Sequence, residues 1–105
     1  MQATYTGTDR TDMLLAAAKV TDAHADAIRA AEACDADRAT RAADRAARAY
    51  ADAYYHARRI LAAPGMDAWS REYAARKLAD AERMHHAAAD IARSVRPFRA
   101  TAARR

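Results

Sequence analysis

The residues of this chain that could bind a metal are Glu82 and His85. A Glu-x-x-His pair places a carboxylate and an imidazole on one face of a helix, as in di-iron helical bundles. One pair is not a site, because a di-metal centre needs two such pairs and further carboxylates, and the chain has only three glutamates. A symmetric dimer would supply the second pair, so a dimeric metal-binding protein is one alternative. The interpretation we favour has no metal or other cofactor, with His85 in a helix interface and Glu82 paired with His86.

Aromatic residues form a second group that could act in binding. Five of them lie within 15 residues of the Pro64-Gly65 pair, namely Tyr50, Tyr54, Tyr55, Trp69 and Tyr73. Antiparallel helices joined at that pair would bring them to one end of the molecule. Tyrosine and tryptophan are enriched in binding hot spots, so Tyr54, Tyr55, Trp69 and Tyr73 are the predicted contacts to a partner protein. The alternative is that Tyr50 and Trp69 fill the core, whereas Tyr54 and Tyr55 point about 100° apart and cannot both be buried in one interface.

Basic residues form the third group. The formal net charge is +4, yet residues 1–63 carry nine basic and nine acidic side chains, so the excess lies nearer the C-terminus. From position 93 onward there is no acidic residue, and six side chains there could contact nucleic-acid phosphates or an acidic partner: Arg93, Arg96, Phe98, Arg99, Arg104 and Arg105. Such contact would be nonspecific, since no base-reading element accompanies it. The alternative is a solvated tail.

No arrangement of residues indicates catalysis. Cys34 is the only cysteine, no histidine or acid is placed to activate it, and we predict that it is a small core residue. A single cysteine allows no disulfide within the chain, the N-terminus does not resemble a signal peptide, and the longest apolar run, residues 13–18, is too short to span a membrane. We therefore expect a cytoplasmic protein that is not an enzyme and does not bind membranes.

The elements that would position these groups are helices. Thirty-four of the 105 residues are alanine, the strongest helix former. Glycine and proline occur only at Gly7, Pro64-Gly65 and Pro97, so nothing breaks a helix over residues 8–63 or 66–96. Asp9 and Asp12 suit the start of the first helix, and Asp67 the start of the last. The sequence thus predicts an all-α fold with antiparallel, alanine-rich helices.

The heptad pattern leaves two architectures open. One stripe runs through Met13, Ala17, Val20, His24, Ala27, Ala31 and Cys34, a second through Ala39, Ala43, Ala46, Tyr50, Ala53, Ala57 and Ile60, and a third through Ala74, Leu78, Ala81, His85, Ala88, Ala92 and Val95. The break after position 34 indicates either a turn near Asp35 or a skip within one long helix. The first gives a three-helix bundle with helices at about 10–34, 37–63 and 68–95. The second gives a long helical hairpin completed by dimerisation.

On either architecture, residues 1–8 form a leader, 9–95 a single helical domain, and 96–105 a basic tail that begins near Pro97. A core built so largely of alanine favours association with a second chain. We therefore predict a non-enzymatic interaction module, such as an inhibitor, adaptor or assembly factor, that docks on another protein or forms a homodimer. A small nucleic-acid-associated protein is the main alternative.

Overall fold

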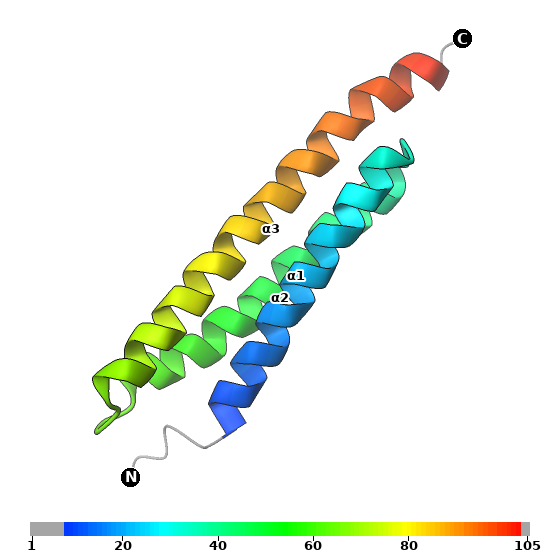
Figure 1. Cartoon of the computed structure of the whole chain (residues 1–105). Coiled ribbons are helices and arrows are strands. Elements are labelled where there is room, and N and C mark those ends of the chain that lie inside the picture. Colours follow the sequence, from blue (N-terminus) through cyan, green and yellow to red (C-terminus); the bar gives the residue numbers. More distant parts are fainter. Residues whose placement is uncertain (1–7, 104–105) are drawn as a thin grey trace.

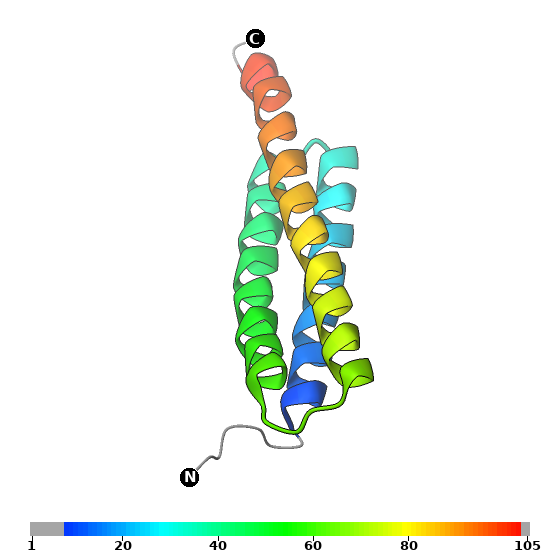
Figure 2. The ribbon, with the colours of Figure 1, turned by 90° about the vertical axis from the view of Figure 1, so that its left-hand side faces the viewer.

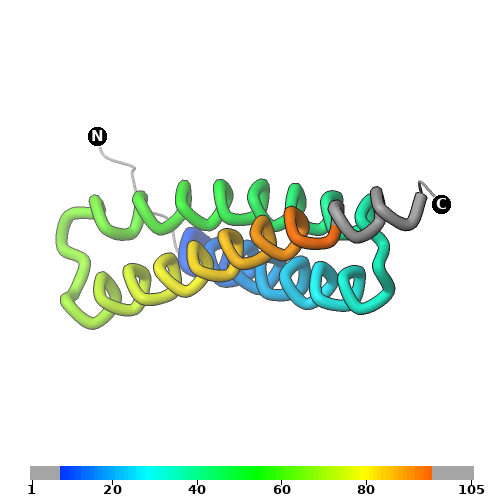
Figure 3. Tube along the Cα trace, turned by 90° about the horizontal axis from the view of Figure 1, so that it is seen from above, coloured from blue at the N-terminus to red at the C-terminus, as the bar shows by residue number. Residues whose placement is uncertain are grey.

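Three helices pack side by side along their lengths. The computed structural model describes residues 8–103, with side chains for residues 8–95. Helices α1 (Thr8–Glu32), α2 (Ala36–Ala62) and α3 (Ala68–Ala103) alternate in direction (Figure 1), and their two turns lie at opposite ends of the bundle (Figure 3). The predicted all-α, antiparallel three-helix bundle is confirmed. The long hairpin is wrong, because α1 ends at Glu32 and a turn separates it from α2.

The turn between α1 and α2 forms without glycine. Cys34 adopts the left-handed backbone conformation, with φ 55°. The Asp35 amide donates to the carbonyl of Ala30 at 2.8 Å, and the Asp35 carboxylate accepts from the Arg38 amide at 3.0 Å, so one residue satisfies the end of α1 and the start of α2. The prediction that Cys34 is a core residue was wrong, because its position in this turn leaves it exposed.

Alanine dominates the core. Met13 and Val20 are the largest fully buried side chains, and the central cluster joins all three helices through Val20, Ala23, Ala27, Ala42, Ala46, Ala49, Ala81 and Ala88. Side chains this small let the helix backbones approach closely, so dispersion contacts replace much of the area that larger residues would bury. The core therefore has little room for a larger side chain.

The buried faces differ in part from the predicted stripes. In α1 the buried positions include Ala16, Ala23 and Ala30, one residue before the predicted Ala17, His24 and Ala31, which are half-buried. The α3 stripe is reproduced more closely, with Leu78 and His85 half-buried and its other members buried. A straight helix repeats every 3.6 residues rather than 3.5, and neighbouring alanines give no size difference that fixes the register.

Helix α3 begins as predicted and ends later. Asp67 accepts a hydrogen bond from the Ser70 amide at 3.0 Å, which confirms it as the cap, and Gly65 takes a positive φ of 78° in the turn before it. The helix then continues through Pro97 to Ala103, past the end of the other two helices (Figure 2), instead of ending at residue 95. Proline removes one backbone hydrogen bond, but its φ fits a helix, and the arginines and alanines around it are strong helix formers.

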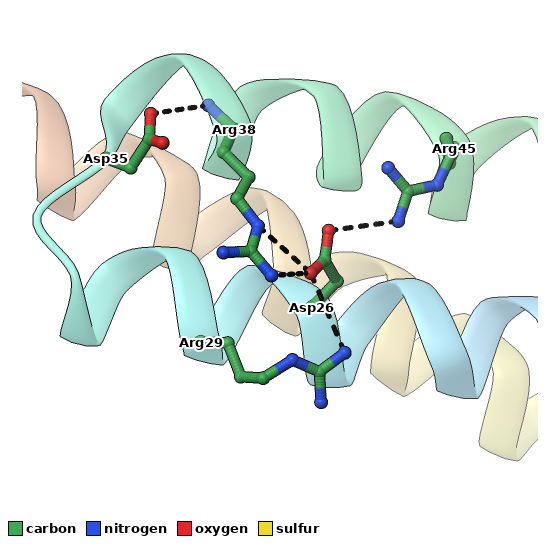
Figure 4. Close-up of polar contacts among 5 residues, drawn as sticks. All are labelled: Asp26, Arg29, Asp35, Arg38 and Arg45. Carbon is green, nitrogen blue, oxygen red and sulfur yellow. Dashed lines mark hydrogen bonds and ion pairs between the residues drawn. The ribbon is translucent and has the colours of Figure 1, made fainter.

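An ion-pair cluster joins α1 to α2 near their turn. The carboxylate of Asp26 on α1 accepts hydrogen bonds from Arg38 Nε and from Arg45 Nη2, each at 3.1 Å, and Arg29 Nη2 lies 3.6 Å away (Figure 4). Hydrogen bonds from Arg38 and then Arg45 lower the pKa of Asp26 below its usual value. The cluster fixes how α1 sits against the first half of α2.

We expect Asp26→Asn to reduce the sensitivity of stability to acid. Because the pKa of Asp26 is lower in the folded protein, the carboxylate stabilises the fold at pH values above its unfolded pKa of about 4, and this contribution is lost as the pH falls further. Thermal unfolding of the wild type and of Asp26→Asn should therefore differ most above about pH 5 and converge toward about pH 2. Asp90→Asn, which removes an exposed carboxylate paired with Arg93 on the same helix, is the control. A constant difference between wild type and Asp26→Asn at every pH would contradict this role.

Candidate protein-docking surface

The predicted aromatic residues lie near the turn between α2 and α3, but their rings form separate groups. Trp69 stacks on Tyr73 with ring centroids 5.2 Å apart and planes 7° from parallel. Tyr50 stacks on His85 at 4.9 Å and contacts Tyr54 at 6.2 Å. Antiparallel packing thus brings α2 and α3 aromatics to one end of the bundle, while the two pairs of predicted contacts, one on each helix, form no ring contact with each other among the described residues.

The exposure of these rings separates core from surface. Tyr50 is half-buried, as its stacking on His85 requires. Trp69 is 60% exposed, so the alternative that it fills the core is wrong. Tyr54 and Tyr55 are 42% and 58% exposed, which places both on the surface. Tyr73 is half-buried, so Tyr54, Tyr55 and Trp69 are the predicted contacts that are exposed for contact with another molecule.

Two arginines organise the exposed tyrosines of α2. Tyr54, Tyr55, Arg58, Arg59 and Ala62 line a shallow hollow of about 570 Å³, which we call the tyrosine–arginine face. The guanidinium of Arg58 lies 5.6 Å from the Tyr54 ring centroid and donates from Nη1 to the Tyr54 hydroxyl at 2.9 Å. The guanidinium of Arg59 lies 5.7 Å from the Tyr55 ring centroid. These cation–π contacts restrict the rotamers of exposed side chains before any partner arrives.

Arg59 is held from below by a buried carboxylate on α1. Asp9, only 3% exposed, accepts from Arg59 Nε through both oxygens, at 3.1 and 3.0 Å, and its Oδ1 lies 2.9 Å from His56 Nδ1. The hydrogen bond with Asp9 raises the pKa of Arg59, so this guanidinium stays charged. The sequence predicted Asp9 at the start of a helix beginning near residue 10, whereas α1 begins at Thr8 and Asp9 lies within its first turn, and the interaction with Arg59 was not predicted. Residues 9, 56 and 59 are separated by most of two helices, and no local pattern joins them.

The weak metal candidates gain no further ligand. Glu82 is exposed, and His85 stacks on Tyr50 with its Nδ1 buried and without a hydrogen-bond partner. Burial, together with the nearby His86, lowers the pKa of His85, which favours the neutral ring. Within the described part of the chain, no group of three or more His, Cys, Asp and Glu residues could hold a metal ion. Within a single chain, His85 therefore lies in the interface between α2 and α3, stacked on Tyr50.

Most of the predicted basic contacts lie outside the described side chains, namely Arg96, Phe98, Arg99, Arg104 and Arg105. Arg93 is exposed and forms an ion pair with Asp90 on the preceding turn of α3. This carboxylate offsets the charge of Arg93, so the unbalanced positive charge begins after that residue. None of the helices, over the residues described, is long and apolar enough to cross a membrane.

A second surface feature is the groove between α1 and α3. Helix α1 contributes Leu14, Ala17, Ala18, Thr21 and Asp22, and α3 contributes Lys77, Asp80, Ala81 and Met84, around a volume of about 360 Å³. The Thr21 hydroxyl lies 3.3 Å from the Met84 sulfur across it. Ile28, which is 40% exposed, follows Thr21 by two helical turns on the same side of α1. The groove therefore combines small and apolar side chains with the charged Asp22, Lys77 and Asp80.

No family model, curated protein or solved structure matches this chain. The fold class follows from the three packed helices. The function must be inferred from the chemistry of the surfaces described above.

Proposed function

We propose that this protein is a non-enzymatic docking module that binds another protein through the tyrosine–arginine face of α2. The observation that carries the proposal is a pair of exposed tyrosines, each in contact with an arginine, around one hollow. Tyrosine and arginine are the residue types, with tryptophan, that contribute most to binding at protein interfaces. Their concentration on one stretch of helix favours docking over catalysis.

The bundle supports such a role mechanically. Helix α2 packs on both other helices, is tied to α1 by the Asp26 cluster near its start, and is tied to α1 again by Asp9 near its end. A face built on a helix held at both ends loses little conformational entropy when it binds. The protein would then act by covering a surface of its partner or by holding the partner in place, as an inhibitor, adaptor or assembly factor does.

We expect Tyr55→Ala to weaken partner binding by about 30-fold, the loss typical of an aromatic hot spot. The measurement is quantitative capture from native extract, followed by titration of the captured partner. Leu15→Ala on α1 is the matched control, because Leu15 is also 58% exposed but does not line the hollow. Equal loss in both variants, or no loss in Tyr55→Ala, would contradict a docking surface on α2. Trp69→Ala in the same assay tests whether the Trp69–Tyr73 pair belongs to the same interface.

Self-association is a second candidate function, favoured by the α1–α3 groove. Leu14 and Ile28 lie seven residues on either side of Thr21, so two apolar side chains are evenly spaced about Thr21 along one side of α1. If two copies of α1 packed antiparallel and crossed at Thr21, each Thr21 would contact the Thr21 of the other copy, as a two-fold symmetric interface requires.

Thr21 lies on the symmetry axis of that arrangement, so we expect Thr21→Cys, made with Cys34→Ser, to form a disulfide-linked dimer under mild oxidation. Ala47→Cys on the exposed side of α2 is the control and should remain unlinked. A purely monomeric protein in light scattering, or a dimer that does not cross-link through position 21, would contradict this mode of association.

A further inference from the structure

The tyrosine–arginine face carries positive charge that its own residues do not balance. Among its five lining residues two are arginines and none is acidic. Asp9 balances Arg59 from beneath, but no ion pair to a carboxylate is formed by Arg58 among the described residues, and its polar contact is the neutral Tyr54 hydroxyl. The surface of the hollow is therefore cationic as well as aromatic.

Hydrogen-bond donors remain on both guanidinium groups. A guanidinium has five N–H donors. Arg58 uses one toward Tyr54, and Arg59 directs Nε toward Asp9, so the Arg59 terminal amino groups are left for Tyr55 and for other acceptors. An acceptor that approaches the hollow can therefore form charge-assisted hydrogen bonds, and a planar carboxylate matches a guanidinium in two-point geometry.

The neighbouring surface suits a polypeptide. Ala51 and Ala47 are exposed one and two turns before Tyr54 and Tyr55, beside the exposed Arg48 and Asp52, so small side chains as well as both charges lie next to the hollow. The charges of residues 1–63 sum to zero, so the two helices around this face lack the extended positive field that a nucleic-acid backbone requires. Arg58, beside the rings of Tyr54 and Tyr55, can therefore pair with a carboxylate of a peptide while the rings contact an apolar side chain next to it.

We propose that the partner of the tyrosine–arginine face is an acidic peptide segment, with an Asp or Glu carboxylate on Arg58 and an apolar side chain between Tyr54 and Tyr55. This inference rests on the proposed docking function and specifies its ligand. Asp9 is a positioning residue in this arrangement, because it holds Arg59 beside Tyr55 without itself facing the partner.

The test is a selection of random 12-residue peptides displayed on phage against the full chain. The selected peptides are then synthesised with a fluorophore and titrated. We expect enrichment of Asp or Glu next to an aliphatic or aromatic residue, and affinity that falls at least tenfold with Arg58→Gln, less with Arg58→Lys, and progressively with added salt. Arg83→Gln on α3 is the control, because it removes an exposed arginine away from the hollow and should leave affinity unchanged. Circular dichroism of each variant establishes that the helices are intact.

The outcomes separate the two proposals. Some peptides could lose affinity with Tyr55→Ala and yet contain no acidic residue, or be unaffected by Arg58→Gln. Such peptides would overturn the proposal of an acidic partner but support the docking surface. If no selected peptide is sensitive to Tyr55→Ala, or if none is enriched, both proposals are overturned. A phosphorylated peptide or a single-stranded oligonucleotide that binds this face more tightly than the selected peptides would assign the site to phosphate instead.

Discussion

Replacing Ala46 by leucine is expected to lower the free energy of unfolding by about 2–3 kcal/mol, the upper part of the range for overpacked cores. Ala46 is fully buried on α2, in the cluster that includes Val20 and Ala27 of α1 and Ala81 of α3. Three extra carbon atoms at that point must separate the helices or force side chains from their rotamers, because the buried members of this cluster are alanines and the stiff, β-branched Val20, which have little freedom to move aside.

Ala47→Leu is the matched control for this prediction. Ala47 is the next residue on the same helix and is exposed, so the same substitution there adds no volume to the core and should change stability by at most about 0.5 kcal/mol. Urea unfolding followed by circular dichroism measures both variants. Equal stability of Ala46→Leu and wild type would mean that the helices are not packed as closely as an alanine core implies.

The same alanines explain which parts of the fold were predictable. Helix content follows from local propensity, and Pro64-Gly65 marks the turn before the last helix, so an all-α fold could be predicted. The turn between α1 and α2 contains neither glycine nor proline, so the sequence left a three-helix bundle and a long hairpin both open. The exact buried face of α1 could not, because choosing Ala16 over Ala17 changes no side-chain size and depends on how the other two helices are placed. Leu78 and His85 on α3 differ from their neighbours, and the predicted stripe there is closer to the structure.

Interactions between distant residues were the least predictable part of the surface. Exposure of at least one of Tyr54 and Tyr55 followed from the angle between adjacent side chains on a helix, and both are exposed. The contacts of Asp26 with Arg38 and of Asp9 with Arg59 depend on the relative rotation and height of α1 and α2. When the interface consists of alanines, the local sequence does not determine the rotation and height of one helix against the other. The polar contacts between α1 and α2 could therefore be seen only in the packed structure.

The second large effect is expected from Asp9→Ala, which should destabilise the protein by about 2–3 kcal/mol. The substitution removes a buried carboxylate that bonds to Arg59 through both oxygens and contacts His56, and it leaves those two side chains without their shared acceptor. Arg59 is 31% exposed and can turn toward water, which keeps the cost below that of a fully buried ion pair. Thermal and urea unfolding measure the loss.

Asp12→Ala is the control for Asp9→Ala. Asp12 also lies in the N-terminal part of α1, so its carboxylate also interacts favourably with the helix dipole. A double-mutant cycle with Arg59→Ala then isolates the pair: we expect a coupling energy of at least about 1 kcal/mol between positions 9 and 59. If Asp9→Ala and Asp12→Ala cost the same, the effect of Asp9 comes from the helix dipole alone. In that case the carboxylate does not tie α1 to α2, and the arginine beside Tyr55 is not positioned by it.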